Sequence, residues 1–512
     1  MYDKERQADA DVTRQSDSES GQLFDDKQLL VVSNRQPYQH EKQTDSDEVS
    51  ISRPVGGLTA SLDPMMQETG GTWIAWGDSS GDRSVVDDSS CVDVPPEEPQ
   101  YTLRRVWLSD SQVQSYYYGF SNQVLWPLCH SGLSTVHSEQ SYWQQYYQTN
   151  QQFADAVATE ADDEAVIWLH DYHLALASWF VRRRLGGKPT IMQFWHIPWP
   201  AWDVFRACPH AEELLRGLLG NDVLGFHVDR YARHFLQCVD AALDDATVNW
   251  RSNEVFYRGS PTRAKAIPMG VPFEKINRKA TSYSRRDFSA FRESYGIDAG
   301  TRVAVGVDRL DYTKGIPERL RALEHLWEQY PEWRGSLTYV QKGTGSRTEI
   351  QAYQRIQTAI DREVERINER FGTDDWQPIE RIAERLSQEE LYGLYRHSDI
   401  GIVSPIRDGF NLVAEEYAAA QTDSDGVLVL STQAGVHDML EESVVSVSPF
   451  DVELFAERLD DALRMSPTER QSRMQRIRET VAANDLQTWL QKNAAAAQAV
   501  GHTRSRPMDD TV

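Results

Sequence analysis

Short apolar segments alternate with helical patterns along most of this chain, and this alternation is what most restricts its fold. Runs such as "QLLVVSN" (28–34), "EAVIWLH" (164–170) and "RVAVGVDRL" (302–310) have the composition of buried strands. Stretches with helical spacing follow them, for example "GIPERLRALEHLWEQY" (315–330). Continuous Val, Ile and Leu strands joined by helices predict an α/β protein with parallel sheets covered on both faces.

With 512 residues, the chain is too long for one ordinary core, and we expect two large domains. Residues 267–291 interrupt the alternation with proline, polar and basic residues, so we place a boundary near residue 274. Each doubly wound domain binds ligands at the carboxyl ends of its strands. The predicted organisation is a disordered acidic tail (1–27), two doubly wound, Rossmann-like domains (28–274 and 275–484), a C-terminal helix (485–500) and a loose tail (501–512).

The charge balance excludes some classes of partner. A net charge of −25 argues against nucleic acid and anionic membranes, and no apolar stretch is long enough to span a bilayer. The acidic surface is either ordinarily solvated or adapted to concentrated salt, which would screen its self-repulsion. The N-terminus lacks signal-peptide features, and the cysteines show neither close pairs nor metal-ligand spacing. We therefore expect a reduced, cytoplasmic protein.

The stretch "VDRLDYTKGIPERL" (307–320) places two cations where a strand gives way to a helix. Arg309 offers a planar fork for phosphate oxygens, whereas Lys314 supplies a compact point charge. Together they could neutralise a diphosphate, including one that gains charge as it leaves. The alternative is a pair of surface cations bonded to neighbouring carboxylates, namely Asp308, Asp311 or Glu318.

A second candidate stretch is "SPIRDGFNLVAEEYAAAQ" (404–421), in which a strand, a loop and a helix beginning near Phe410 follow one another. The unpaired N–H groups at a helix N-terminus are a ready anion site. Asp408 would disfavour a diphosphate there unless it faces sugar hydroxyls. Glu415 and Glu416 either favour the helix dipole or bind a ribose diol.

Histidines and a carboxylate follow two other apolar runs. His170 and His173 suggest a metal, but no third ligand at suitable spacing accompanies them, so we predict no metal site. Asp171, at the end of its strand, is better suited to binding a hydroxyl. His196 also lies at the end of a strand. It is either a site residue or a histidine whose hydrogen bonds are satisfied within the core. Two further loop candidates are Arg35 after the first strand and the pair Gly56–Gly57, which permits close approach of a ligand.

Taken together and in this order, the motifs closely resemble one enzyme family. They are "VVSNR", "GGL", "GFSNQVLWPLCH", "HDYHL", "HIPWP", "FRACPHAEELLRGLLGNDVLGFH", "VDRLDYTKGIPERL" and "RDGFNLVAEEY". They resemble trehalose-6-phosphate synthase from about Leu29 to about Leu490. The resemblance implies a retaining glucosyltransferase of GT-B architecture, with two Rossmann-like domains facing across a cleft. It implies that the N-terminal domain (28–274) binds the acceptor, that the C-terminal domain (275–484) binds the nucleotide sugar, and that the helix 485–500 packs back on the N-terminal domain. It implies transfer of glucose from a nucleotide-diphosphate glucose, usually UDP-glucose, to glucose 6-phosphate, with no cofactor and no metal.

The resemblance also assigns roles on the donor side. Arg309 and Lys314 would hold the diphosphate, Asp408 would bind hydroxyls of the transferred glucose, and His196 would lie beside that sugar. The remaining donor positions are Gly56 and Gly57 in a closing loop, Leu386 at the base, Gly409, Phe410 and Asn411 in the glucose pocket, and Leu412, Val413, Ala414, Glu415 and Glu416 at phosphate and ribose.

On the acceptor side, Arg35 and Arg347 would bind the phosphate. Tyr117, Trp126 and Asp171 would contact the sugar, with Trp76 in the matching aromatic region. The predicted catalytic set is Asp171, His196, Arg309, Lys314 and Asp408. Phe410 stands where methionine is common in the family, and tryptophans flank His196, so the lining of the donor pocket differs in detail.

Two alternative functions stay open from the sequence. One is a related enzyme with another phosphorylated acceptor, such as glucosylglycerol-phosphate synthase, which takes glycerol 3-phosphate. The other is a regulatory homologue without turnover, although the charged candidate residues are all present. A homo-oligomer is also an open alternative.

Overall fold

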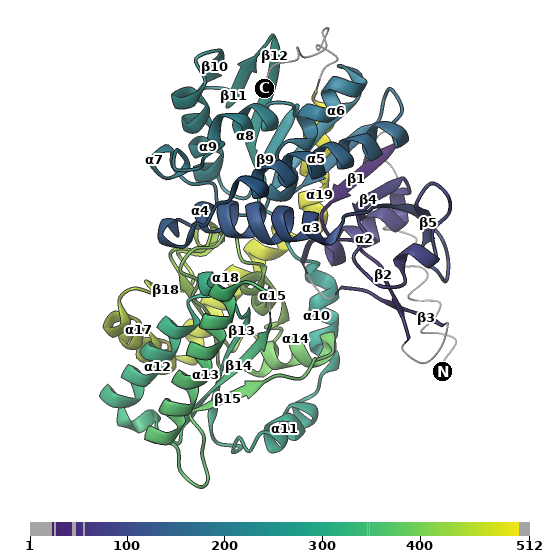
Figure 1. Ribbon diagram of the computed structural model, residues 1–512. Coiled ribbons are helices and arrows are strands. Elements are labelled where there is room, and N and C mark those ends of the chain that lie inside the picture. Colours follow the sequence, from purple (N-terminus) through teal and green to yellow (C-terminus); the bar gives the residue numbers. More distant parts are fainter. Residues whose placement is uncertain are drawn as a thin grey trace. The chain divides into compact units, whose positions relative to one another are not determined.

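The computed structural model describes residues 23–24, 27–43, 48–54, 57–345, 347 and 349–500 (Figure 1). The chain divides into two compact units, one formed by Met1–Ile267 with Leu490–Val512 and the other by Pro268–Trp489. The crossing between Ile267 and Pro268 falls at the start of the interruption seen in the sequence. Among the described residues, no helix has both the length and the apolar character needed to cross a membrane.

The first unit is built on a 10-stranded sheet with the order β10-β11-β12-β9-β8-β7-β1-β4-β6-β5. Neighbouring strands are parallel from β12 to β6, and the outer pairs β10–β11, β11–β12 and β5–β6 are antiparallel. The strands are β1 (Leu29–Ser33), β4 (Thr72–Trp76), β5 (Cys91–Val94), β6 (Tyr101–Val106), β7 (Val166–His170), β8 (Thr190–Trp195), β9 (Val223–Phe226), β10 (Ala246–Asn249), β11 (Glu254–Tyr257) and β12 (Ser260–Ala266); β2 (Gln39–Lys42) and β3 (Val49–Ser52) form a separate hairpin.

Helices cover this sheet and complete its crossovers. Helix α5 packs against β1, β4 and β6, and α9 packs against β9 to β12. Leu23 and Phe24, within the predicted tail, are buried, because these apolar side chains pack into the first unit. The helices are α2 (Gly57–Thr69), α3 (Asp110–Gln112), the π-helix η2 (Val113–Leu125), α4 (Trp126–Cys129), α5 (Gln140–Glu160), α6 (Ala177–Leu185), α7 (Trp202–Phe205), α8 (Ala211–Leu218) and α9 (Asp229–Ala242), with short 3₁₀ turns η1 (Asp82–Ser84), η3 (Leu133–Thr135) and η4 (Tyr172–Leu174).

The second unit holds a 6-stranded sheet in which every neighbouring pair is parallel. Its order, β15-β14-β13-β16-β17-β18, is that of a doubly wound nucleotide-binding fold, with the direction of winding reversing between β13 and β16. In the first unit the same reversal falls between β1 and β7. The strands of the second sheet are β13 (Arg302–Arg309), β14 (Leu337–Thr344), β15 (Ile379–Ile382), β16 (Ile400–Val403), β17 (Val427–Ser431) and β18 (Val445–Val447).

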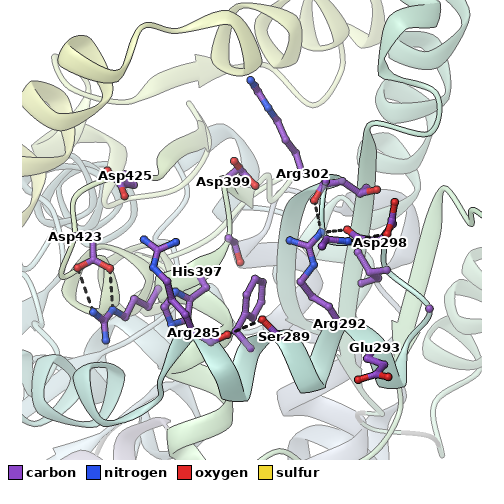
Figure 2. A pocket seen from close by; sticks show the side chains of 18 of the residues that line it. Arg285, Ser289, Arg292, Glu293, Asp298, Arg302, His397, Asp399, Asp423 and Asp425 are labelled. Atoms are coloured by element: carbon purple, nitrogen blue, oxygen red, sulfur yellow. Dashed lines mark hydrogen bonds and ion pairs between the residues drawn. The ribbon is translucent and has the colours of Figure 1, made fainter.

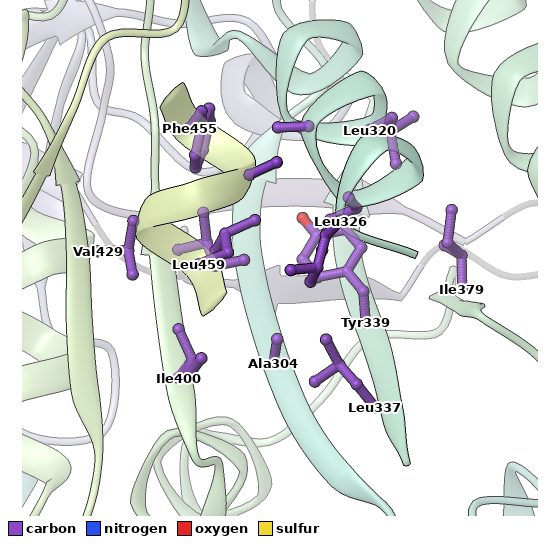
Figure 3. Packing of buried hydrophobic residues seen from close by; sticks show 14 of the residues in the cluster. Ala304, Leu320, Leu326, Leu337, Tyr339, Ile379, Ile400, Val429, Phe455 and Leu459 are labelled. Carbon is purple, nitrogen blue, oxygen red and sulfur yellow. The ribbon is translucent and has the colours of Figure 1, made fainter. Parts of the chain in front are cut away.

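Two helices close the core over one face of the second sheet. Leu320 and Leu326 of α12 and Phe455 of α17 pack over strand residues such as Ala304 and Ile400 (Figure 3). Helices α10, α14 and α15 pack against one another, and α18 packs against α15. The helices of this unit are α10 (Phe273–Ser282), α11 (Arg285–Ser294), α12 (Ile316–Gln329), α13 (Gln351–Phe371), α14 (Gln388–His397), α15 (Leu412–Ala420), α16 (His437–Leu440), α17 (Val452–Arg464) and α18 (Pro467–Ala483), with 3₁₀ turns η5 (Tyr312–Lys314) and η6 (Pro331–Trp333). Helix α19 (Leu486–Gln498) begins in this unit, and from Leu490 it belongs to the first unit.

Candidate active site

The winding of the second sheet reverses between β13 and β16, and we call this place the switch point of the sheet. The loops that follow these two strands bring three predicted residues together there. The Lys314 ammonium donates a hydrogen bond to Oδ2 of Asp408 over 2.5 Å. The Asn411 amide donates to the same oxygen over 3.0 Å. Both side chains of the ion pair are largely buried, with 15% of each exposed. A cation and a carboxylate are thus held at the place where such folds bind nucleotides.

Asp311 gathers two predicted arginines around one buried carboxylate. Its Oδ2 lies 3.9 Å from Arg309 and 3.8 Å from Arg347. The other carboxylate oxygen, Oδ1, accepts from the backbone N–H and the hydroxyl of Thr313, each over 3.0 Å. Burial alone would raise the pKa of the carboxyl, but the two arginines, the Thr313 N–H and Lys314 outweigh burial and lower the pKa. Asp311 therefore stays ionised and fixes a cluster of positive charge.

The other acidic residues of the stretch 307–320 pair elsewhere. Asp308 accepts a hydrogen bond from the fully buried guanidinium of Arg319 over 2.8 Å. Arg319 also donates to the hydroxyl of Ser404 over 2.8 Å, which ties β13 and α12 to the end of β16. Glu318 pairs with Arg321 at 3.3 Å.

Close approach of the two loops requires a glycine. Gly315 has φ +64°, and a Cβ on it would lie 2.2 Å from the carbonyl oxygen of Ser404. The carbonyl of Thr313 accepts a hydrogen bond from the N–H of Ile406 over 2.8 Å. Any larger residue at position 315 would push apart the loops that carry Lys314 and Asp408.

A third loop, after β17, supports the loop that carries Asp408. The N–H of Asp408 donates to the carbonyl of Gln433 over 3.1 Å, and the N–H of Val436 donates to that of Phe410 over 3.0 Å. A Cβ on Gly435 would lie 2.1 Å from a carbonyl oxygen of the supported loop. The loop that carries Asp408 continues into α15, and together they contain Gly409, Phe410, Asn411, Leu412, Val413 and Ala414.

Helix α15 begins at Leu412, later than expected, because Asn411 takes a left-handed backbone conformation with φ 90°. Glu415 is fully buried, and neither carboxyl oxygen has a hydrogen-bond partner among the described residues. Burial, with Glu416 beside it, raises the pKa of Glu415 well above its ordinary value. Burial also raises the pKa of Glu416 to about 7.

In the first unit, Arg35 and an aromatic group lie beyond the end of β1. The exposed Arg35 donates to the hydroxyl of Tyr117 over 3.0 Å. The Tyr117 ring lies 5.8 Å from that of Trp76 and stacks on His173 at 5.7 Å. Tyr117 belongs to the π-helix η2, and π-helical turns are frequent at functional sites. Trp126, at the end of the same segment, is 5% exposed and packs against Tyr172.

Asp171 has a backbone conformation that non-glycine residues rarely adopt, with φ 71° and ψ 174°. Its N–H donates to the carbonyl of Phe194 over 2.7 Å, and the Gln193 amide donates to its carbonyl over 3.0 Å. Its carboxylate accepts from the N–H groups of Tyr172 over 3.0 Å and His196 over 3.4 Å. Such conformations cost about 1–3 kcal/mol and cluster at functional sites. Arg347 and Asn411 also have positive φ, at 48° and 90°.

The histidines flagged in the sequence lie against one another at strand ends. Nδ1 of His170 lies 3.2 Å from Nε2 of His196. Burial lowers the pKa of His170 to about 3. Burial, then His227 and His170, lower the pKa of His196 well below its ordinary value. Both rings are therefore neutral at physiological pH. His227, which the sequence analysis did not single out, joins them because it follows the adjacent strand β9.

Two further predicted positions lie apart from these groups in the sequence. Leu386 lies between β15 and α14, just before Ser387, whose side chain caps α14 in a capping box with Glu390. Gly57 is the first residue of α2 and has φ 70°. Gly56 lies outside the described residues.

A hollow of about 1130 Å³ in the second unit lies at the opposite end of the sheet from these loops. It is lined by α11 and by residues before β13, β16 and β17 (Figure 2). Its arginines are bound internally: Arg396 pairs with Asp423 at 3.1 Å, and Arg292 donates to the carbonyl of Thr301 over 2.7 Å. None of the predicted site residues lines it. In the part of the chain that the structure describes, no cluster of His, Cys, Asp or Glu could hold a metal ion.

Comparison with known proteins identifies the family. The model of glycosyltransferase family 20 matches residues 27–499. The UDP-forming alpha,alpha-trehalose-phosphate synthase of Schizosaccharomyces pombe is 33% identical over 486 residues, covering 94% of this chain and 93% of that protein.

Solved structures show the same likeness. An E. coli structure bound with UDP-2-fluoro glucose is 32% identical, has a TM-score of 0.83, and is matched over 93% of this chain and 100% of that chain. A UDP-forming alpha,alpha-trehalose-phosphate synthase from Burkholderia xenovorans, in complex with glucose-6-phosphate, is 32% identical with a TM-score of 0.81, over 92% and 100% of the two chains. The α/β fold with two doubly wound units is thereby confirmed, and the chain belongs to glycosyltransferase family 20.

Proposed function

We propose that this chain is an α,α-trehalose-phosphate synthase that transfers glucose, with retention, from UDP-glucose to glucose 6-phosphate. The observation that carries the proposal is the charge cluster at the switch point of the second sheet. There Asp311 holds Arg309 and Arg347 in place, and Lys314 is held by Asp408. The cluster offers fixed positive charge to a leaving diphosphate. The S. pombe relative, which this chain matches over most of both lengths, is a UDP-forming synthase.

On the donor side, Arg309 and Lys314 take the diphosphate. An ammonium has several N–H donors, so Lys314 can keep its bond to Asp408 while it donates to a phosphate oxygen. Asp408 then presents its second oxygen to a hydroxyl of the transferred glucose. The N–H groups at the start of α15 add to the positive potential, with Gly409, Phe410 and Asn411 shaping the sugar pocket.

Retention follows from attack on the face that the diphosphate leaves. The acceptor hydroxyl oxygen forms the new bond to the anomeric carbon, the bond to the phosphate oxygen breaks, and the hydroxyl proton passes to that phosphate oxygen. Double displacement would instead need a carboxylate nucleophile close to the anomeric carbon. Asp408 is already engaged by Lys314 and Asn411, which suits a hydroxyl-binding role better than a nucleophilic one.

On the acceptor side, the phosphate-binding residues that the resemblance predicts are Arg35 and Arg347. Asp171 and Tyr117 bind sugar hydroxyls, and Trp76 and Trp126 shape the aromatic wall. Support comes from the exposure of Arg35 and its hydrogen bond to Tyr117. The strained backbone of Asp171 adds to it, since strain of this kind persists where a side chain must be aimed.

Incubation of the purified chain with several nucleotide sugars and acceptors tests the proposal. The products are identified by mass, and the anomeric configuration by NMR. The expected outcome is trehalose 6-phosphate from UDP-glucose and glucose 6-phosphate, with free glucose a far poorer acceptor. A preference for glycerol 3-phosphate would replace the proposal with a glucosylglycerol-phosphate synthase. Binding of the substrates without any product would favour a regulatory homologue.

We also propose that the chain acts in the cytoplasm. The four cysteines, Cys91, Cys129, Cys208 and Cys238, are all free thiols. A reducing compartment favours this state. Fractionation of the source cells with an antibody against the chain tests the assignment, and recovery from an extracytoplasmic fraction would contradict it.

A further inference from the structure

Three adjacent strands of the first sheet each have a histidine as their last residue or directly after it. Strands β7, β8 and β9 are neighbours and run parallel. His170 is the last residue of β7, His196 follows β8, and His227 follows β9. Because the carboxyl ends of parallel strands meet at one edge of the sheet, the sheet itself brings these three side chains into a row, with His196 in the middle.

The middle ring is in contact with both of its neighbours. The His170 and His196 rings lie 5.5 Å apart and nearly parallel, at 24°. The His196 and His227 rings also lie 5.5 Å apart, at 58°. The ring of Phe194 packs against His196 at 4.7 Å and against His227 at 5.0 Å. The outer histidines are buried, with 0% and 4% exposed, whereas His196 is only partly buried.

The contact between His170 and His196 couples their protons. A neutral imidazole carries one N–H and one acceptor nitrogen. In the 3.2 Å contact between Nδ1 of His170 and Nε2 of His196, one nitrogen donates and the other accepts. Whichever ring donates, the tautomer of one ring fixes that of the other, and therefore fixes the character of the second nitrogen of His196.

We propose that His170 and His227 are positioning residues that hold the His196 imidazole in one orientation and one neutral tautomer beside the donor sugar. This inference rests on the proposed function, in which His196 lies beside the transferred glucose. Positive charge develops at the anomeric carbon during transfer, so a cationic ring there would oppose it. A neutral ring with a fixed nitrogen can bind a sugar hydroxyl without that penalty. Asp171 is a charged group near this ring, and its carboxylate accepts from the backbone N–H of His196 over 3.4 Å.

NMR of the wild-type chain labelled with ¹⁵N-histidine tests the tautomer without any substrate. The His196 resonances are assigned by their loss in His196→Gln. The expected result is one neutral tautomer for His196, unchanged between about pH 6 and 8. Averaged shifts that report a mixture of tautomers would overturn the proposal. Because no turnover is involved, this result stays readable even if the product assay contradicts the proposed function.

Kinetics of two His170 variants separate hydrogen bonding from packing. His170→Phe keeps an aromatic ring but removes the nitrogen, and we expect kcat/KM for the donor to fall about tenfold, mainly through kcat. His170→Asn places an amide near the position of Nδ1 and should restore activity to within about threefold. Equal losses in both variants, with unchanged thermal stability, would reduce His170 to a packing residue and overturn its assigned role.

His227 and a matched control complete the test. His227→Phe keeps the ring and should retain activity and the single His196 tautomer, whereas His227→Ala should lose both. An unchanged tautomer and rate in His227→Ala would overturn the part assigned to His227. His234, on α9 of the same unit, serves as the control. Its Nδ1 lies 3.0 Å from the carbonyl oxygen of Trp199. His234→Asn should leave donor kcat/KM unchanged, and a loss equal to that of His170→Phe would mean that any such histidine matters.

Discussion

Lys314 and Asp408 join the two loops at the switch point of the second sheet through a single 2.5 Å hydrogen bond between their charged groups. The residues are far apart in the chain, and the crossover between β13 and β16 is what brings them together. Each neutralises the other until a ligand arrives. Under the proposed function, a diphosphate would meet a cation already held in position, and a sugar hydroxyl would meet a carboxylate already held in position.

Replacing Lys314 by alanine should lower kcat by about a hundredfold, comparable to the loss of one preorganised charge donor. The measurement is turnover at saturating donor and acceptor. Lys188→Ala is the control, because Lys188 forms an exposed pair with Asp163, also at 2.5 Å, in the first unit. Near-normal turnover in Lys314→Ala, or an equal loss in Lys188→Ala, would contradict a role for Lys314 at the leaving group.

Asp311→Asn should destabilise the fold and slow the reaction, because Arg309 and Arg347 would lose the buried carboxylate between them. Breaking such a buried pair costs about 3–5 kcal/mol. The pKa of Asp311 is lowered in the folded state, so its contribution is complete above the ordinary value of about 3.9 and is lost as pH falls through the lowered value. Urea unfolding at pH 7 and at about pH 2 should show the difference between variant and wild type shrinking in acid.

An exposed aspartate provides the comparison for this experiment. Asp374→Asn, in the loop before β15, should match wild type at both pH values. A difference between Asp311→Asn and wild type that stays constant with pH would mean that the carboxylate charge is not what stabilises the cluster.

Glu415→Gln should stabilise the protein at neutral and alkaline pH. The pKa of Glu415 is raised in the folded state, so the folded chain keeps a proton that the unfolded chain releases above about pH 4.3. Stability therefore falls as pH rises from there towards the folded pKa, by about 1.4 kcal/mol per pH unit for one proton. Thermal unfolding at pH 5 and pH 8 should show this fall in wild type and a smaller one in the variant.

Exposed Glu453 of α17 gives the matched control for Glu415. Glu453→Gln should leave the pH dependence of wild type intact. A Glu415→Gln variant that loses stability equally at both pH values would show that the carboxyl is held by interactions that favour its charged form.

Tyr117→Phe should raise the KM for glucose 6-phosphate about fivefold while leaving donor KM unchanged. The variant keeps the ring contacts with Trp76 and His173 but removes the hydroxyl that accepts from Arg35 over 3.0 Å, and one such bond is worth about 1 kcal/mol. Arg35→Ala should remove most of the preference for glucose 6-phosphate over free glucose. Full retention of that preference in Arg35→Ala would refute the assignment of Arg35 to the phosphate.

The sequence predicted the fold where local patterns determine the elements. The run Val303–Val307 lies within β13, which continues to Arg309, so that the first cation is itself the last strand residue. Apolar runs and helical spacing are enough to predict these strands and helices, because each element has a hydrophobic pattern of its own. For the partner of Arg309, the sequence left Asp308, Asp311 and Glu318 as alternatives. A linear sequence does not show which of these carboxylates becomes buried beside the arginine.

Other features depend on tertiary contacts and were not predictable. The row of His170, His196 and His227 requires the order of β7, β8 and β9 within the sheet, which the sequence does not state. The π-helix η2 gives no periodic signal of its own, yet it carries Tyr117. The conformation of Asp171 is imposed by its bonds to Phe194 and Gln193, against the local preference of an aspartate.

The backbone of Asp171 bears on how this chain would respond to artificial selection. Glycine tolerates that conformation without strain, so Asp171→Gly removes a backbone cost that the wild type carries. A library screened only for heat resistance would favour this replacement and lose the carboxylate with it. Screening for turnover would retain the aspartate at the expense of melting temperature, so the two screens should diverge at this position.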